Sequence, residues 1–511
     1  MAISLANDSV VAPFLIRPAL THSDSTLSLA SSWAIVATIA VGVVLLLFSA
    51  ALKLKTMSSH GIYDHIPPAI DYGIGGILRG SLHLIMSARS ILDAGYRQHG
   101  GRTFKIPAFG MWRVVVNTSE LADEICKASE DDMSLHLALD ATFAMSYTMV
   151  PSYCSLDAIT AIVTKAIRQS LSKSVEHQVY ADLSDEISTA FKDTLHGVGH
   201  DGNDDQLVKL SIRLTLDIMA TGMLLPLFPR ACRRFVADAC LYVLGTKRRF
   251  ASHLHSVISE RLRLHSPIAD KASRDRVDLL DHFIEQTPPD KRTVDFIVHM
   301  IMISNVAAIH TSAITLTQAL LHLATSQEYQ RELRLEASPI LESLGWTPEA
   351  FSQMPKLDSF LKESSRMNGI GLASPFRMVL RDYTLSDGTR VSPETIVCSN
   401  IRAIHRDERV YAHAEEFDGF RFADQLNVSS SSFDRPTRHY YAFGYGRHTC
   451  PGRFLASAEL KMMMTYLVLN FDMVVEDPVA SLAPSDFVFS ISASRSARIL
   501  LKRRGATQSA I

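Results

Sequence analysis

The stretch FGYGRHTCPG occupies residues 443–452 and runs directly into RFLASAELKMMM, a sequence that predicts a helix. Cys450 therefore lies close to a helix start, where the first backbone N–H groups have no partner within the helix. These groups and the positive end of the helix dipole favour a thiolate over a thiol. Gly446 and Gly452 leave room for a flat cofactor to approach the backbone, and Phe443 supplies an apolar wall. The stretch predicts one anionic sulfur ligand on a tight loop.

The other cysteines and the charge balance narrow the class of protein. The six cysteines are widely spaced and include no C-x-x-C pair, so a disulfide scaffold is not expected and the main body should reside in a reducing compartment. A lone cysteine there is most often a buried, inert thiol, and only the residues around Cys450 favour another interpretation. Lys plus Arg number 51 against 53 for Asp plus Glu, a formal charge of -2. No nucleic-acid partner is expected, because no basic field would attract one.

The loop resembles the signature F-x-x-G-x-x-x-C-x-G of the cytochrome P450 superfamily. Four residues meet it in full: Phe443, Gly446, Cys450 and Gly452. The resemblance implies haem b as the cofactor, with the Cys450 thiolate as the axial ligand of its iron. His448 stands where the family often has arginine, and it still offers an N–H donor to a haem propionate. Its neighbour Arg447 is a second candidate for the propionate.

An uncharged segment over residues 296–327 is long enough to span a membrane. Its many Ser, Thr, Asn, Gln and His side chains predict instead a long helix through the protein core that touches a polar site. Within it AAIHTS, residues 307–312, resembles the oxygen-binding motif of the family, which implies that Thr311 hydrogen-bonds to dioxygen and passes protons to it. His310 stands where the family usually has an acid. It can still carry protons, and the alternative is a core histidine bonded to a backbone carbonyl.

Two further stretches resemble supporting motifs of the family. Glu363 and Arg366 form an E-x-x-R pair on one helical face, and Arg421 in EEFDGFRF resembles the arginine that completes their cluster. The resemblance implies a structural cluster that locks the core, in which the loss of one partner would strand a buried charge. Arg377 in SPFR resembles a residue at the haem edge and is expected to bind a propionate. The alternative for Arg377 is an ordinary surface arginine.

Residues 33–52 carry no charge, and as a helix they are long enough to cross the ~30 Å hydrocarbon core of a bilayer. We predict a single transmembrane helix there, with a cleaved signal peptide as the alternative. Lys53 and Lys55 follow the run, so the positive-inside tendency places residues 1–32 in the lumen of the endoplasmic reticulum and the catalytic body in the cytosol. Asn7 in this tail then matches an N-glycosylation site.

The rest of the chain predicts one large domain. Residues 53–68 form a linker that ends in Pro67 and Pro68, which hold the chain extended. The domain over residues 69–511 is expected to be mainly α-helical with small β-sheets, because helical periodicity dominates and the strand-like runs are short. This composition agrees with the cytochrome P450 fold that the resemblance implies.

The resemblance also implies an activity. It predicts a monooxygenase that oxidises a small hydrophobic molecule with O2 and with electrons from NADPH–cytochrome P450 reductase, since the chain has no flavin or nicotinamide fingerprint of its own. The sequences of residues 307–312 and 415–422 resemble fungal gibberellin, indole-diterpene and meroterpenoid oxidases, which implies a terpenoid of secondary metabolism as substrate. The alternatives are a haem-thiolate protein that binds without oxygenating, and an isomerase or dehydratase that needs no reductase. Thr311 favours oxygenation.

Overall fold

A computed structural model describes most of the chain after residue 64. The described residues are 2–5, 11–12, 65–72, 76–108, 111–171, 176–196, 203–265, 278–423, 431–478, 482, 485–494 and 496–505. The predicted membrane helix over residues 33–52 and the predicted glycosylation site at Asn7 lie outside them, as does most of the predicted linker.

Helices make up most of the described chain, as predicted. They are α2 (Gly76–His99), α3 (Ser119–Lys127), α4 (Leu135–Phe143), α5 (Met145–Thr148), α6 (Leu156–Ser170), α7 (Glu176–His196), α8 (Asn203–Leu224), α9 (Arg230–Leu244), α10 (Thr246–Leu264), α11 (Leu279–Gln286), α12 (Val294–Ala324), α13 (Gln327–Leu344), α14 (Pro348–Ser352), α15 (Pro355–Met367), α16 (Ile401–His405) and α18 (Arg453–Asn470). Short 3-10 turns are η2 (Leu225–Leu227), η4 (Pro289–Lys291) and η5 (Gly446–His448).

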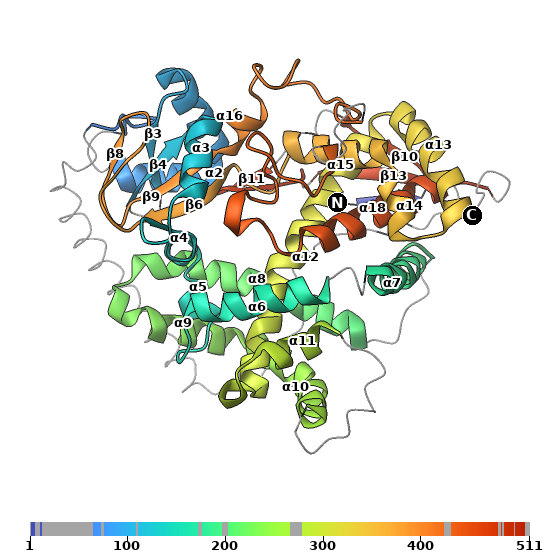
Figure 1. The fold of residues 1–511 in the computed structure, drawn as a ribbon, viewed down its shortest axis with the longest axis horizontal. Coiled ribbons are helices and arrows are strands. Elements are labelled where there is room, and N and C mark those ends of the chain that lie inside the picture. Colours follow the sequence, from blue (N-terminus) through green and yellow to red (C-terminus); the bar gives the residue numbers. More distant parts are fainter. Residues whose placement is uncertain are drawn as a thin grey trace.

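The strands form small sheets at separate places among the helices (Figure 1). They are β1 (Ala2–Leu5), β2 (Val11–Ala12), β3 (Phe104–Ala108), β4 (Met111–Val116), β5 (Met133–Ser134), β6 (Ala373–Val379), β7 (Tyr383–Thr384), β8 (Arg390–Val391), β9 (Ile396–Asn400), β10 (Phe471–Val475), β11 (Ser485–Phe487), β12 (Ser490–Ser492) and β13 (Arg498–Arg503). The largest sheet has the order β3-β4-β9-β6-β5, in which β4 and β9 are parallel and the other neighbours antiparallel.

The five-stranded sheet is covered on both faces, because successive side chains of a strand point to opposite sides. Val115 of β4 packs in a cluster with residues of α2, whereas Val114 and Val116 pack in another cluster with residues of α3. The sheet therefore fixes α3, which contacts η5 of the loop over residues 443–452, and β6, whose Arg377 interacts electrostatically with Arg447 and His448 of that loop.

The longest helix, α12, runs through the centre of the molecule (Figure 1). Thr293 begins it as an N-cap, since its side chain accepts the Phe296 N–H. Its first half packs in one hydrophobic cluster with α6, α8, α10 and α11, and its last turns pack in another with α13, α15 and α18. Among the described helices it alone is long and apolar enough to cross a membrane. Its packing between the two clusters agrees with the core helix predicted from the sequence.

The second sheet has the order β10-β13-β1-β2, in which β1 pairs in parallel with β13. This pairing places residues 2–5 beside the C-terminal strand of the body. This pairing and the predicted lumenal position of residues 1–32 exclude each other, because a strand cannot pair with the body from the other side of a bilayer.

Candidate functional site

The cysteine loop is tight for reasons that its sequence shows. Gly444 and Gly446 adopt φ values of 74° and 72°, a left-handed conformation that favours glycine. The Cys450 backbone N–H donates to the carbonyl of Phe443 at 2.8 Å and closes the loop. The helix α18 begins at Arg453, so Cys450 precedes it by three residues, slightly farther than the sequence predicted.

Burial dominates the ionisation of the Cys450 thiol in the protein alone. It raises the pKa of Cys450, and the N–H groups of Gly452 and Arg453 lower the pKa by a smaller amount. The expected effect of the helix start is therefore present but does not by itself favour a thiolate. A bound metal ion would supply the missing positive charge, since a coordinating thiol loses its proton outright.

The two signature glycines have different roles. Gly446 adopts a left-handed φ, and a side chain there would lie in ordinary contact with the Cys126 carbonyl of α3, at 3.5 Å, so the turn alone already requires this glycine. At Gly452, by contrast, a side chain would meet no atom within 4 Å. A flat group beside Gly452 would need such open space. Phe443 packs edge-on against Phe433, with ring centroids 5.0 Å apart, and thereby fixes the loop to the main core.

Arg447 and His448 share an acidic partner that the sequence did not reveal. His448 Nε2 lies 2.6 Å from Glu130 Oε1, and Arg447 Nη1 lies 3.6 Å from the same oxygen. Arg447 also donates to the carbonyl of Ala128 at 3.0 Å, which caps the end of α3. Glu130 thus contacts both residues of the loop that are predicted to bind a propionate.

Arg377 is a buried cation without a complete set of partners. Its side chain on β6 is almost wholly buried, so the alternative of a surface arginine is wrong. Nη1 donates to the Phe376 carbonyl at 2.9 Å, whereas Nη2 is buried and has no hydrogen-bond acceptor in the described part of the chain. A buried guanidinium in this state calls for an anion.

Side chains in the middle of α12 are exposed, whereas many of those toward its two ends are buried. Ala307 and Ala308 are exposed, although residues on both sides of them are in the core. Thr311 lies one turn later and its hydroxyl donates to the Ala307 carbonyl at 2.8 Å. His310 Nε2 is buried and has no partner among the described residues, and burial lowers the pKa of this histidine. The middle of the helix thus carries two small exposed side chains and a partly buried hydroxyl, with a histidine next to Thr311 whose Nε2 is buried.

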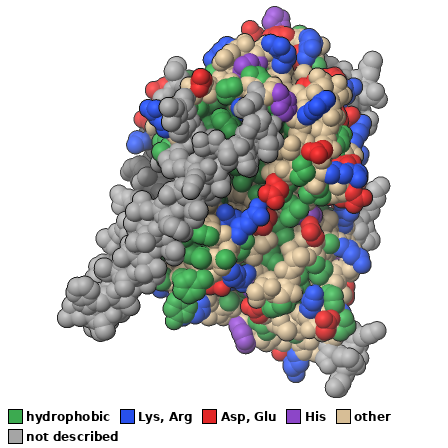
Figure 2. Space-filling model, turned by 90° about the vertical axis from the view of Figure 1, so that its left-hand side faces the viewer, with side chains coloured by type: hydrophobic (Ala, Val, Ile, Leu, Met, Phe, Trp, Pro, Cys, Tyr) green, Lys and Arg blue, Asp and Glu red, His purple; other side chains and the backbone are tan. Residues whose placement is uncertain are grey.

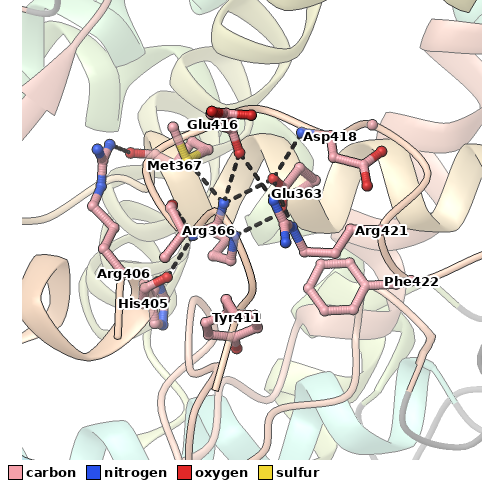
Figure 3. Close-up of polar contacts among 12 residues, drawn as sticks. Glu363, Arg366, Met367, His405, Arg406, Tyr411, Glu416, Asp418, Arg421 and Phe422 are labelled. Carbon is pink, nitrogen blue, oxygen red and sulfur yellow. Dashed lines mark hydrogen bonds and ion pairs between the residues drawn. The ribbon is translucent and has the colours of Figure 1, made fainter. Parts of the chain in front are cut away.

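The predicted cluster of Glu363, Arg366 and Arg421 forms as expected (Figure 3). Glu363 and Arg366 are fully buried on α15 and make two hydrogen bonds, of 2.6 Å and 2.8 Å. Arg421 Nε donates to Glu363 Oε1 at 3.1 Å. Arg366 Nη1 donates to the backbone carbonyls of His405 and Ala414, and Nη2 also reaches the carbonyl of Glu416. The cluster ties the end of α16 and the segment over residues 412–421 to α15 and is therefore structural.

The residues at the loop fit the haem that the resemblance implies. Cys450 offers a sulfur ligand, Gly452 leaves open space, and Arg377 offers a buried cation for a propionate. These three features are independent of one another. Haem carries a metal, a flat ring and two carboxylates, and each feature matches one of them.

Comparisons with known proteins agree with this fit. The sequence model of the family described as Cytochrome P450 matches residues 157–494. Cytochrome P450 monooxygenase 71 from Postia placenta is 30% identical over 427 residues, which cover 77% of this chain and 84% of that protein. Cytochrome P450 monooxygenase 151 from the same organism is 29% identical, covering 83% and 91%. Cytochrome P450 monooxygenase paxQ from Penicillium paxilli is 25% identical, covering 84% and 90%.

Proposed function

This chain belongs to the cytochrome P450 family and is a haem b monooxygenase, and from that premise we propose that Cys450 ligates the iron and that the substrate is a terpenoid. The observation that carries the assignment is the loop at Cys450, with open space at Gly452 and with the buried, incompletely bonded Arg377, which interacts electrostatically with Arg447 and His448 of the loop. When bound, the haem supplies two-electron activation of dioxygen, which the thiolate promotes.

The side chains of this protein hold the cofactor and move protons. We assign Arg377 and His448 to the propionates, because one is a buried cation and the other an N–H donor beside it in the network of Glu130. Arg447 caps α3 and contributes a further positive charge at this edge. Thr311 lies in the exposed middle of α12 and can donate to and accept from dioxygen. His310 passes protons to it, as a neutral imidazole that is both donor and acceptor.

Replacing His310 with alanine tests the second catalytic residue. We expect haem content and the substrate-induced spectral change to stay near those of the wild type, while product per NADPH falls several-fold and peroxide release rises. Both quantities are measured on one preparation. Unchanged coupling together with less haem-loaded protein would instead make His310 a core residue, because only packing would then have been lost.

The terpenoid assignment rests on sequence resemblance in two stretches, residues 307–312 and 415–422. The residues of α12 next to Ala307 and Ala308 in the sequence carry no Asp, Glu, Lys or Arg, which supports a hydrophobic substrate. We expect the protein, reconstituted with NADPH–cytochrome P450 reductase, to oxidise a diterpenoid, indole-diterpene or meroterpenoid and to incorporate one atom from labelled O2. Omission of reductase or of NADPH should abolish the product.

Two outcomes would contradict this assignment at different levels. A product that forms without reductase and carries no labelled oxygen would indicate an isomerase or dehydratase. If only fatty acids gave labelled products, the protein would still be a monooxygenase, but the assignment of a terpenoid substrate would be wrong.

Membrane attachment is supported by the sequence before the domain and by one face of the domain. Of the 20 residues 33–52, eleven are Ile, Val, Leu or Phe, and each gains about 1.5–3 kcal/mol when removed from water. On α9 the side chains of Phe235, Tyr242 and Val243 are at least 70% exposed. The face of the molecule in Figure 2 carries several groups of hydrophobic side chains. We place the protein in the endoplasmic reticulum membrane, with its body in the cytosol.

An epitope tag before Ala2 tests the orientation. If residues 33–52 span the bilayer once with the tail in the lumen, the tag is protected from added protease in sealed microsomes and the body is digested. Digestion of the tag together with the body would place residues 2–5 on the cytosolic side, paired with β13, and would remove the single-pass arrangement.

A further inference from the structure

A buried carboxylate on α15 joins the two segments that flank the cysteine loop, residues 443–452. Lys461 Nζ of α18 donates to Asp358 Oδ2 at 2.6 Å, and the side chains of Lys461 and Asp358 are only 9% and 12% exposed. The other carboxylate oxygen, Oδ1, accepts the backbone N–H of Phe433 at 2.9 Å. Phe433 precedes the loop in the sequence, and α18 follows it. Asp358 therefore binds the chain on both sides of Cys450.

A neighbouring lysine holds the same segment to α15. Lys362 lies one turn after Asp358, and its Nζ donates to the Ser432 carbonyl at 3.2 Å. The Ser432 hydroxyl also reaches Asp358 Oδ1, at 3.5 Å. Residues 432 and 433 are therefore fixed by two side chains of α15, one through a backbone carbonyl and the other through a backbone N–H.

Phe433 transmits this position to the loop by packing. Its buried ring meets that of Phe443 edge-on, with the ring centroids 5.0 Å apart. The Phe443 carbonyl in turn accepts the Cys450 N–H at 2.8 Å. The contacts thus lead from Asp358 to Cys450 in three steps, and Lys461 on α18 connects the same carboxylate to the chain after the loop. Because protein interiors are close-packed, a shift of either flanking segment moves the loop or breaks one of these contacts.

We propose that Asp358 is a positioning residue for the Cys450 thiolate, which it holds in place from both sides of the loop. This inference rests on the proposed function, in which Cys450 ligates the iron. A loop that is held rigidly keeps its sulfur on the iron, whereas a loop that is free to move lets a neutral ligand replace it. The alternative is an ion pair that only stabilises the fold.

Asp358→Asn and Lys461→Met test the proposal through the ferrous–carbon monoxide spectrum instead of the activity. We expect each variant, when freshly purified, to show the band of thiolate-ligated haem at about 450 nm. This band should then convert to the shorter-wavelength form about tenfold faster than in the wild type, because each variant leaves a buried charge without its partner. Lys461→Arg keeps the cation and should convert more slowly than Lys461→Met.

Phe433→Leu tests the step between the carboxylate and the loop. This variant keeps the backbone N–H that Asp358 binds but removes the ring that packs on Phe443. We expect it also to accelerate the conversion of the band. In the double variant with Asp358→Asn the acceleration should be smaller than the product of the two single effects, because both changes interrupt the same series of contacts.

Asp281→Asn is the matched control for loss of stability alone. Asp281 lies on α11, and its carboxylate is 4% exposed. It accepts from Arg261 Nη1 at 2.7 Å and from the Asp278 N–H at 3.0 Å, so it has one cationic and one backbone donor, as Asp358 has. The helix α11 packs with α6, α10 and α12. Asp281→Asn should lower the unfolding temperature about as much as Asp358→Asn and leave the conversion rate within about twofold of the wild type.

Wild-type conversion rates in Asp358→Asn and Lys461→Met would overturn the proposal. Equal acceleration by Asp281→Asn would also overturn it, because the rate would then follow stability alone. If neither charge variant folds with haem, Phe433→Leu decides, since it removes no charge and wild-type conversion in it contradicts the proposal. A wild-type protein without the band at about 450 nm would instead contradict the assignment of Cys450 as the ligand, so the two failures are distinguishable.

Discussion

Replacing Arg366 with methionine is expected to lower the free energy of unfolding by about 3–5 kcal/mol. The change leaves the buried carboxylate of Glu363 with only Arg421 as a charged partner, and it strands carbonyls of His405 and Ala414 that now accept from the guanidinium. Methionine fills much of the volume, so lost charge and hydrogen bonding account for most of the cost. Urea unfolding followed by circular dichroism measures it.

The matched control is an exposed pair of the same type and spacing. Arg331 and Glu328 are also three residues apart on a helix and 2.6 Å from one another, but both side chains are at least 60% exposed. Arg331→Met should therefore cost at most about 1 kcal/mol. Equal losses in the two variants would show that the cluster of Figure 3 does not lock the core as we describe.

Replacing Cys450 with serine is expected to reduce product formation below about 1% of the wild type, because a neutral hydroxyl cannot donate to the iron as a thiolate does. The fold should persist. The loop is closed by the backbone N–H of residue 450, which serine keeps, and by the packing of Phe443 on Phe433. Product assays with reductase, together with thermal unfolding, measure the two effects separately.

Cys154→Ser is the control for this substitution. Cys154 is another partly buried free thiol, and its Sγ lies near the Ser155 carbonyl at 3.5 Å. We expect this variant to keep full activity. A Cys450→Ser protein that still forms product at the wild-type rate would remove Cys450 from the site.

Features of the structure that depend on a local sequence pattern could be predicted from the sequence. The stretch around Cys450 predicts a tight loop, and the structure has one, with Gly444 and Gly446 at positive φ. The polar side chains among apolar ones over residues 296–327 imply a core helix, and α12 is one. The spacing of Glu363 and Arg366 implies a pair on one helical face, which the structure contains.

Contacts between distant segments could not be predicted in this way. Glu130 and His448 are 318 residues apart, and the local sequence around neither residue predicts the contact between them. The same holds for Ser312 with Glu459, and for β1 with β13. The sequence also could not predict the direction of the Cys450 pKa shift, because that direction depends on how deeply the loop is buried and not on the helix start alone.

The ferrous–carbon monoxide difference spectrum of the intact protein tests the central claim most directly, since it reports the ligand opposite the gas. The account predicts an absorption band at about 450 nm, from a thiolate-ligated haem, that Cys450→Ser abolishes. A band at the shorter wavelength of a neutral ligand in the freshly purified wild type, or a band at the original position in Cys450→Ser, would contradict it.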